Sequence, residues 1–259
     1  QVTEGLSRVP VVRQFVRNAP PPTYTQETFE NVPGYAEYLT TLQAFDGEDI
    51  VFLYSVSAET GALAMSEWVE LPAGYDGRER AYYSGAVRNS GFYVTDPYFN
   101  PEGVAGVDPT AITVSYPIRS AENEILGVFA IDLSLSQVRR YVADQIDATA
   151  TRIWLYTGSG AIIYHPDLDV GNEVPYLDSG FEASGIEGGL EMTSRFTMPE
   201  QQVFTVNRES GGPLLIATAP VPSLPWQVAV SIPERRISTQ IASSLARTTG
   251  VSLGIVMLF

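Results

Sequence analysis

The chain has 259 residues, 44% of them hydrophobic, which is enough to bury a core and excludes a disordered chain. Its net charge of −15 argues against a nucleic-acid partner, because phosphate binding needs concentrated basic residues. Cysteine and lysine are both absent, which excludes disulfides, thiolate metal sites, Schiff-base lysines and P-loop lysines. The length suits one large domain or two small ones.

Apolar residues spaced three and four apart predict a long N-terminal helix, with a kink or restart after Ser7 because Pro10 interrupts it. Three prolines at 20–22 end this segment, and a second helical stripe follows Pro33. We therefore expect residues 1–45 to form an entering helical stalk. The two stripes consist of Val2, Leu6, Val9, Val12 and Val16, and then of Tyr35, Leu39 and Leu42.

Short strands and turns are predicted after residue 45. Residues 50–57 are rich in β-branched and aromatic side chains, and 62–65 run back after a turn. Two further strands, 111–118 and 125–133, form a second predicted hairpin. Ser134 then begins a helix, because Gln137 stands three residues later at capping-box spacing. The apolar stripe of this helix is Leu135, Val138, Val142 and Ile146.

The second half of the chain repeats the strand pattern of the first half. Three weak matches occur in the same order, and such order predicts two copies of one α/β module with a boundary near Asp147. The matched segments are 52–54 with 61–64 against 154–156 with 160–163, then 115–118 against 218–221, and 130–133 against 229–232.

The C-terminal segment 234–259 is predicted to be one helix. Its last residues, 251–259, are uncharged and apolar. They are fewer than the roughly 20 residues that span a bilayer. Because they are apolar, we interpret them as the first turns of a membrane helix. A buried C-terminal helix is the alternative interpretation.

Sequence features typical of enzymes are sparse. His165 is the only histidine, and no nucleophile-elbow motif stands beside it, so we expect a strand-end histidine bonded to backbone. Paired carboxylates for glycoside hydrolysis occur by chance among 30 acidic residues. The acidic segments 46–49 and 167–169 do not match the EF-hand loop, so solvated turns are expected there. We expect no catalytic residue, metal or cofactor.

The segment 71–100 is the best candidate for a binding site. Tyrosines surround an arginine-rich turn there, and Arg80 offers a planar fork that grips a carboxylate. Tyrosine rings accept a cation or an apolar stem, and their hydroxyls add hydrogen bonds. Packing of these rings between helix and sheet, with solvated arginines, is an equally good interpretation. The tyrosines are Tyr75, Tyr82, Tyr83, Tyr93 and Tyr98.

Asp132 favours the binding interpretation. It stands in an otherwise apolar predicted strand, where a carboxylate is costly unless it is paired. A ligand ammonium would pair with it, and so would an internal arginine or capping amides. The second module has Ser231 at the matching position and has no Arg-x-Tyr-Tyr segment. A site of this kind is therefore expected in the first module only.

These residues resemble the double Cache family of extracytoplasmic sensor regions, and the resemblance covers nearly the whole chain. It implies an α+β fold with two tandem PAS-like antiparallel-sheet modules between an entering helix and an exit helix. The implied division is 1–45, 46–147 (membrane-distal), 148–233 (membrane-proximal) and 234–259. The segments that carry the resemblance are 80–83, 96–98, 115–118, 127–135, 161–166 and 225–228.

One branch of the family binds amino acids, and the resemblance implies a role for each matching residue here. Tyr75, Arg80 and Tyr82 would meet the ligand carboxylate, and Asp132 would hold its ammonium. Tyr83 and Tyr98 would line the pocket, where Asn100 also lies.

Two positions depart from the family pattern. Tyr82 replaces a tryptophan and keeps an aromatic wall with a donor. Asn100 replaces an aspartate, which removes one of two charges for the ammonium. The loss would weaken amino-acid binding by about tenfold, or the ligand is a less cationic carboxylate or another nitrogenous metabolite.

The resemblance implies a sensor that binds a small metabolite and signals across the membrane in a chemoreceptor, histidine kinase or cyclic-dinucleotide enzyme. It further implies a periplasmic location, membrane attachment through the flanking helices and a homodimer in the full receptor. A secreted carboxylate-dependent hydrolase and a surface adhesion module without a small ligand are the alternatives.

Overall fold

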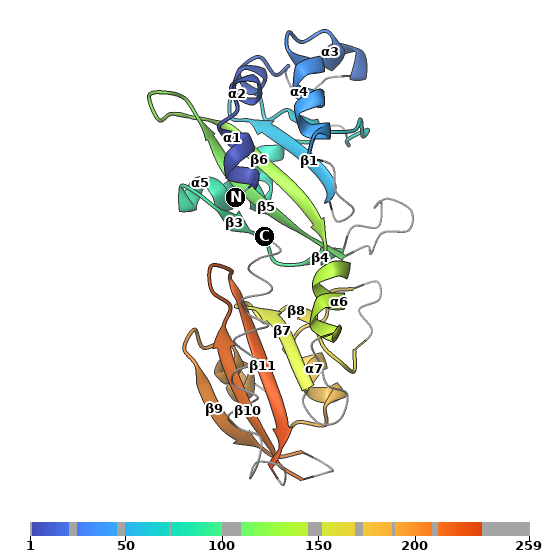
Figure 1. Cartoon of the computed structure of the whole chain (residues 1–259), viewed down its shortest axis with the longest axis vertical. Helices are drawn as coiled ribbons and strands as arrows, with labels where there is room; N and C mark the ends of the chain where they lie inside the picture. Colours follow the sequence, from blue (N-terminus) through green and yellow to red (C-terminus); the bar gives the residue numbers. More distant parts are fainter. Residues whose placement is uncertain are drawn as a thin grey trace. The chain divides into compact units, whose positions relative to one another are not determined.

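The computed structural model describes residues 2–20, 25–45, 50–72, 74–99, 110–144, 152–168, 173–187, 190–208 and 212–234 (Figure 1). The fold is mixed α+β with two antiparallel sheets, consistent with two tandem PAS-like modules. The chain divides into two compact units. The first contains Gln1–Thr95 and Ala111–Ser134, and the second continues from Leu135 and includes the short segment Asp96–Glu102.

The N-terminal segment is two short helices, α1 (Val2–Ser7) and α2 (Pro10–Arg17), so the predicted restart after Ser7 is confirmed and the helix is not one continuous element. The break lies where Pro10 predicted it. Proline has no N–H to donate and fits only the first turn of a helix, so α2 begins with it. Two more short helices follow, α3 (Gln26–Glu30) and α4 (Tyr35–Gln43), and Thr25 caps α3 in a capping box with Thr28.

The first sheet is antiparallel, with the strand order β2-β1-β6-β5-β3, and β4 also pairs with β5. A 3-10 turn, η1 (Gly77–Glu79), and helix α5 (Ala81–Asn89) lie between its second and third strands in the sequence. The strands are β1 (Ile50–Ser57), β2 (Leu63–Met65), β3 (Tyr93–Val94), β4 (Tyr98–Phe99), β5 (Thr110–Arg119) and β6 (Ile125–Ser134).

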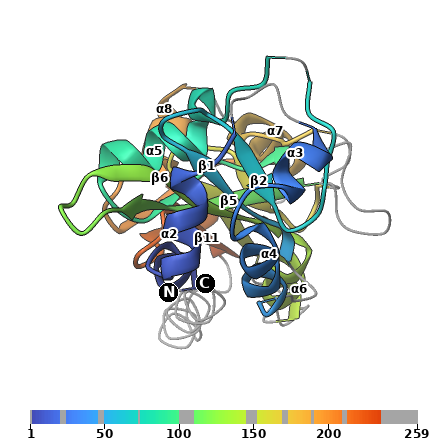
Figure 2. The same cartoon turned by 90° about the horizontal axis from the view of Figure 1, so that it is seen from above.

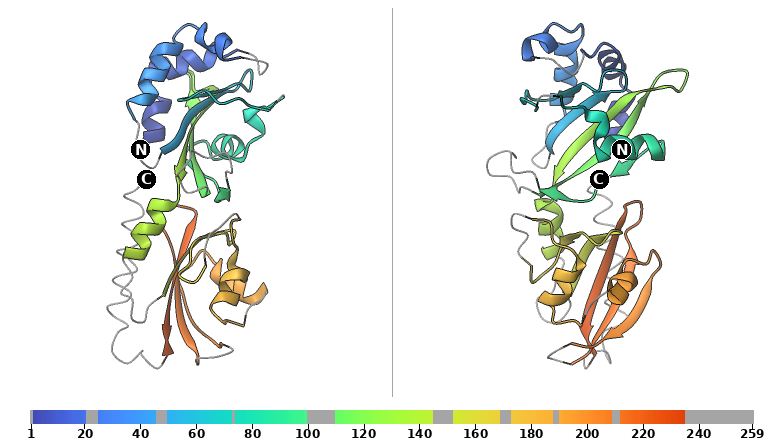
Figure 3. Two further views of the ribbon diagram at one scale, coloured as in Figure 1. Left: turned by 90° about the vertical axis from the view of Figure 1, so that its right-hand side faces the viewer. Right: turned by 180° about the vertical axis from the view of Figure 1, so that it is seen from behind.

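Helices cover both faces of the first sheet, so each strand contributes alternate residues to two cores. Figures 2 and 3 show α2 and α4 on one face and α5 on the other. Leu53 and Ile131 face the first core, which contains Phe15 and Tyr38. Tyr54 and Ala130, one residue along in each strand, face the second core beneath α5. The second core is the one that carries the tyrosine-rich segment.

The second sheet is antiparallel with the order β8-β7-β11-β10-β9. Helices α7 (Leu177–Ala183) and α8 (Leu190–Phe196) pack on one of its faces, as Figure 3 shows. Trp154, Phe181 and Phe196 are fully buried in this core. The strands are β7 (Arg152–Thr157), β8 (Ile162–Tyr164), β9 (Gln202–Val206), β10 (Leu214–Pro220) and β11 (Trp226–Pro233).

The repeat that the sequence predicts corresponds to equivalent strands in the two sheets. The hairpin β1–β2 corresponds to β7–β8, and β5–β6 corresponds to β10–β11. One alignment is corrected by the pairing register. Tyr54 faces Ala130 and Trp154 faces Ala229, so Trp154 corresponds to Tyr54 and not to Phe52. Pairing follows the hydrogen-bond ladder, which sequence similarity of three residues cannot fix.

Helix α6 (Ser136–Asp144) begins two residues after the predicted start, and Ser134 is the last residue of β6. Ser134 still pairs with Ala111 in the sheet, so the helix starts later than predicted, and the capping box with Gln137 stays a prediction. The predicted exit helix lies outside the described residues, apart from Glu234. Within the described ranges, no helix is both long and apolar enough to cross a bilayer.

Candidate functional site

Asp132 lies near the end of β6 on the face that α5 covers, and its residue is only 8% exposed. Its Oδ1 accepts hydrogen bonds from the Tyr54 hydroxyl at 2.8 Å and from the Thr113 hydroxyl at 2.7 Å. Both donors come from the neighbouring strands β1 and β5. Hydrogen bonds from neutral hydroxyls offset part of the cost of removing a carboxylate from water.

Tyr82 links the Asp132 carboxylate to Arg80 indirectly, through contacts with Tyr54 and Tyr75. Its ring packs edge-on against Tyr54 at 5.2 Å between centroids, and its hydroxyl lies 3.4 Å from that of Tyr75. The Arg80 Nε donates a long hydrogen bond of 3.4 Å to the same Tyr75 hydroxyl. The Arg80 guanidinium also lies 5.0 Å from the Tyr75 ring centroid. We call Arg80, Tyr75, Tyr82, Tyr54, Thr113 and Asp132 the tyrosine cluster.

The tyrosine cluster has a cation at one end and a carboxylate at the other. Burial, more than its neighbours Tyr75 and Asp132, raises the pKa of Tyr82 well above its ordinary value, so this phenol stays neutral. The hydrogen bond to Tyr75 raises the pKa of Arg80, which stays charged. Neutral donors and acceptors thus lie between opposite charges. Such an arrangement complements a small zwitterion.

Helix α5 is fixed on the sheet by contacts of its first turns. The Ser115 hydroxyl of β5 donates to the Tyr82 carbonyl at 2.9 Å. Gly85 allows α5 to approach β3, because a Cβ there would lie 2.3 Å from the Tyr93 ring. Arg80 is the residue that precedes α5, and it also ends η1. Its backbone is therefore held from both sides.

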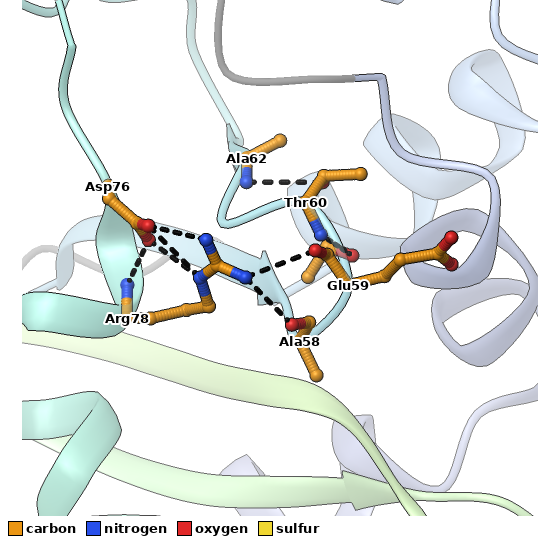
Figure 4. Close-up of polar contacts among 7 residues, drawn as sticks. Ala58, Glu59, Thr60, Ala62, Asp76 and Arg78 are labelled. Carbon is orange, nitrogen blue, oxygen red and sulfur yellow. Dashed lines mark hydrogen bonds and ion pairs between the residues drawn. The ribbon is translucent and has the colours of Figure 1, made fainter.

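Arg78 forms a clip between two segments of the first module (Figure 4). Its guanidinium grips both oxygens of Asp76, with Nη2 2.6 Å from Oδ2, and its Nη1 donates to the carbonyls of Ala58 and Glu59 at 3.2 and 3.0 Å. The hydrogen bonds that Asp76 accepts from Arg78 lower the pKa of Asp76. Gly61 sits against the pair at φ 74°, where a Cβ would lie 2.2 Å from Asp76 Oδ1. The clip fastens the β1–β2 turn to the segment that carries Tyr75 and Arg80.

The remaining predicted site residues are less closely tied to the cluster. Tyr83 is half-buried on α5, burial raises its pKa, and Arg78 opposes that rise. Tyr98 is half-buried in β4, and its place in a pocket stays a prediction. Asn100 lies outside the described residues. Sequence reasoning missed Tyr54 and Thr113, whose approach to Asp132 depends on strand register.

His165 follows β8 and is 3% exposed. Its Nδ1 accepts a hydrogen bond from the Asp167 N–H at 3.1 Å, as expected for a strand-end histidine bonded to backbone. Burial, aided by Arg152, lowers its pKa to about 4. Among the described residues no group of His, Asp and Glu side chains could hold a metal ion. The acidic segment 46–49 and Asp169 lie outside those ranges.

Comparison with known proteins shows which family this chain belongs to. A model described as Cache domain (dCache_1) matches residues 5–241. The chain belongs to this Cache family. It is 27% identical over 153 residues to the methyl-accepting chemotaxis protein PctB of Pseudomonas aeruginosa, covering 55% of this chain and 24% of PctB. It is 26% identical over 186 residues to McpA of Pseudomonas putida, covering 70% of this chain and 26% of McpA. The matches thus cover about a quarter of these relatives.

Solved ligand-binding domains of chemoreceptors share the fold. The ligand-binding domain of the P. aeruginosa amino-acid chemoreceptor PctC, in complex with GABA, has a TM-score of 0.60 and 22% identity, with 89% of this chain and 88% of that one covered. The ligand-binding domain of PctB with L-Arg has a TM-score of 0.57 and 21% identity, with 93% and 88% covered. That of Pseudomonas fluorescens CtaA with L-serine has a TM-score of 0.56 and 18% identity, covering 91% and 87%.

Proposed function

We propose that this chain is the extracytoplasmic sensor region of a membrane receptor, and that its first module binds a small molecule bearing both an amino group and a carboxylate. The observation that carries the proposal is the tyrosine cluster, with the Arg80 guanidinium at one end and the buried Asp132 carboxylate at the other. Chemoreceptor relatives with bound amino acids support the same ligand class. Signalling would pass to an output region outside this chain.

The ligand carboxylate would meet Arg80, Tyr75 and Tyr82, and the ligand ammonium would meet Asp132. Tyr54 and Thr113 orient the carboxylate of Asp132, since both donate to its Oδ1. Tyr83 and Tyr98 would add aromatic walls. Asn100 brings one charge fewer than an aspartate, so we expect a modest affinity for plain α-amino acids or a preference for a less cationic relative.

The proposed division is a helical segment 1–45, a ligand-binding module 46–147, a second module 148–233 and an exit segment 234–259. Attachment to a membrane through the flanking segments, and a homodimer in the complete receptor, belong to the same proposal. The family and its chemoreceptor members support a sensor. They give no support to a hydrolase or to an adhesion module.

Calorimetric titration of the chain with amino acids, matched carboxylates without the amino group and matched amines would test this proposal. We expect amino acids to bind more tightly than either fragment class. Arg80→Ala and Asp132→Asn should each raise the Kd about tenfold or more, because each removes a charge-assisted contact. Arg88→Ala is the matched control, since Arg88 is exposed on α5 and its loss should leave the Kd unchanged. Equal affinities for all four proteins would overturn the site.

A further inference from the structure

Tyr75 and Arg80, at the cationic end of the tyrosine cluster, lie on either side of the short turn η1. Tyr75 belongs to no helix or strand, and Arg80 is exposed where η1 meets α5. The hydrogen bond between them is 3.4 Å long and therefore weak. A 3-10 helix of three residues has poor hydrogen-bond geometry of its own. The spacing of Tyr75 and Arg80 therefore depends on what holds η1.

Two residues of η1 are fastened to the β1–β2 turn. The Arg78 Nη1 donates to the carbonyls of Ala58 and Glu59 at 3.2 and 3.0 Å. The Gly77 N–H donates to the Gly61 carbonyl at 3.1 Å. Three carbonyls of one turn thus hold η1 against the edge of the first sheet.

Asp76 fixes the orientation of the Arg78 side chain. Its Oδ1 accepts from the Arg78 backbone N–H at 2.9 Å, which caps η1. The guanidinium donates to both carboxylate oxygens, from Nε to Oδ1 at 2.9 Å and from Nη2 to Oδ2 at 2.6 Å. Such a two-point contact sets the plane of the guanidinium as well as its position. Figure 4 shows this plane between the Asp76 carboxylate and the turn carbonyls.

Two glycines let these segments meet without slack. Gly61 has φ 74°, and a Cβ there would lie 2.2 Å from Asp76 Oδ1. Gly77 is buried, and a Cβ there would lie 2.7 Å from Cγ2 of Val56 in β1. Movement of η1 towards the sheet is therefore blocked, and movement away from it would break the hydrogen bonds of Arg78.

Stability alone gives little reason for this construction. The side chains of Arg78 and Asp76 are 38% and 22% exposed, and ion pairs that reach solvent contribute little to folding. The geometry, in contrast, is specific, because one guanidinium contacts a carboxylate and two backbone carbonyls at once. Its main effect falls on the residues that flank η1.

We propose that Asp76 and Arg78 are positioning residues of the ligand site, which hold Tyr75 and Arg80 at the spacing that a ligand carboxylate requires and do not touch the ligand themselves. The inference rests on the function proposed for the tyrosine cluster. Side chains held in the bound arrangement lose less conformational freedom when the ligand binds, so affinity rises. The β1–β2 turn is thereby part of the support of the binding site.

Calorimetric titration of the whole chain tests the proposal. The probe is the one of L-alanine, L-serine, L-arginine and GABA that binds the parent chain most tightly. Arg78→Ala should raise its Kd about tenfold, because Tyr75 and Arg80 lose their fixed spacing. Arg119→Ala is the matched control. The Arg119 Nη1 also donates to a turn carbonyl of the first module, that of Asn123 at 3.0 Å, and its loss should leave the Kd unchanged.

Asp76→Asn separates positioning from direct attraction. If Arg78 itself attracted the ligand carboxylate, its release from Asp76 would lower the Kd. A positioning role predicts the opposite sign, a Kd raised about threefold or more, because the amide cannot accept at both ends of the fork. Arg78→Lys keeps the charge but has no planar fork, so it should also raise the Kd.

A double variant shows the route of the effect. If the clip acts through the residues beside η1, adding Arg78→Ala to Arg80→Ala should raise the Kd by less than Arg78→Ala does alone. Melting curves without ligand check that every variant is folded, and a loss of packing unrelated to Arg80 would make the two effects add in full.

The outcomes separate this inference from the function on which it rests. The positioning role alone fails if Arg80→Ala weakens binding while Arg78→Ala binds as the parent does. It also fails if Asp76→Asn binds more tightly or if the two arginine substitutions add in full. Both proposals fail if none of the four probes binds the parent chain, or if Arg80→Ala leaves the Kd unchanged.

Discussion

The two sheets share one strand order but differ in charge at corresponding positions. In the first, Asp132 pairs with Phe52 and Thr113, and in the second Ser231 pairs with Arg152 and Ile216. The carboxylate of the first module is thus replaced by a hydroxyl, and an apolar ring by a guanidinium. The comparison teaches that strand order and pairing set which positions face one another, whereas the side chains at those positions set the local charge.

The largest expected effect concerns the two separate cores. Phe15→Ala in the first and Phe196→Ala in the second each remove a fully buried ring, and we expect each to lower the free energy of unfolding by about 3–5 kcal/mol. Differential scanning calorimetry should show that each variant shifts a different transition. One common transition that both variants lower equally would contradict independent modules.

The next effect is the acid sensitivity of the second module. His165 has a folded-state pKa of about 4, below its ordinary value of 6.5, so between these values the unfolded chain binds the extra proton. Stability is full above about pH 6.5 and falls by up to about 3 kcal/mol towards pH 4. Urea unfolding of the second module across this range should follow that fall. The His165→Gln variant should be less stable, and its stability should depend less on pH between these values. An unchanged pH dependence of stability would contradict the assignment of this effect to His165.

Exchange of the residues that differ between modules sharpens the comparison further. Asp132→Ser gives the first module the residue of the second, and we expect a loss of about 1.5–3 kcal/mol in the binding free energy of a cationic ligand. Calorimetry would measure this. Asp144→Ser is the matched control, because Asp144 is exposed at the end of α6. An unchanged Kd in Asp132→Ser would show that the carboxylate does not meet the ligand.

The smallest effect is expected at the clip. Arg78→Ala breaks the pair with Asp76, whose side chain is 22% exposed against 38% for Arg78, so we expect a loss of only about 1 kcal/mol in stability. The pKa of Asp76 is lowered, so its contribution is present above the unfolded value near pH 4 and is lost as the pH falls further. Chemical unfolding at pH 7 and pH 3 would measure both. A loss that is larger at pH 3 would contradict this sign.

The sequence by itself determined the elements and their repetition. Spacing of apolar residues located the strands, and Pro10 marked the break between α1 and α2. The isolated carboxylate of Asp132 in an apolar strand also stood out, as did the tyrosines and arginines before α5. Each of these signals is local, because strand alternation, proline geometry and burial of a charge act over a few neighbouring residues.

Only the tertiary structure decided which side chains meet. Tyr54 and Thr113 reach Asp132 because of the pairing register of β1, β6 and β5. Arg78 and Arg80 are two residues apart and chemically alike, yet one clips a turn and the other meets Tyr75. The sequence matched Ser231 to Asp132, but only strand pairing placed Ser231 opposite Arg152. Such meetings depend on hydrogen-bond ladders and packing between distant segments, which no local pattern encodes.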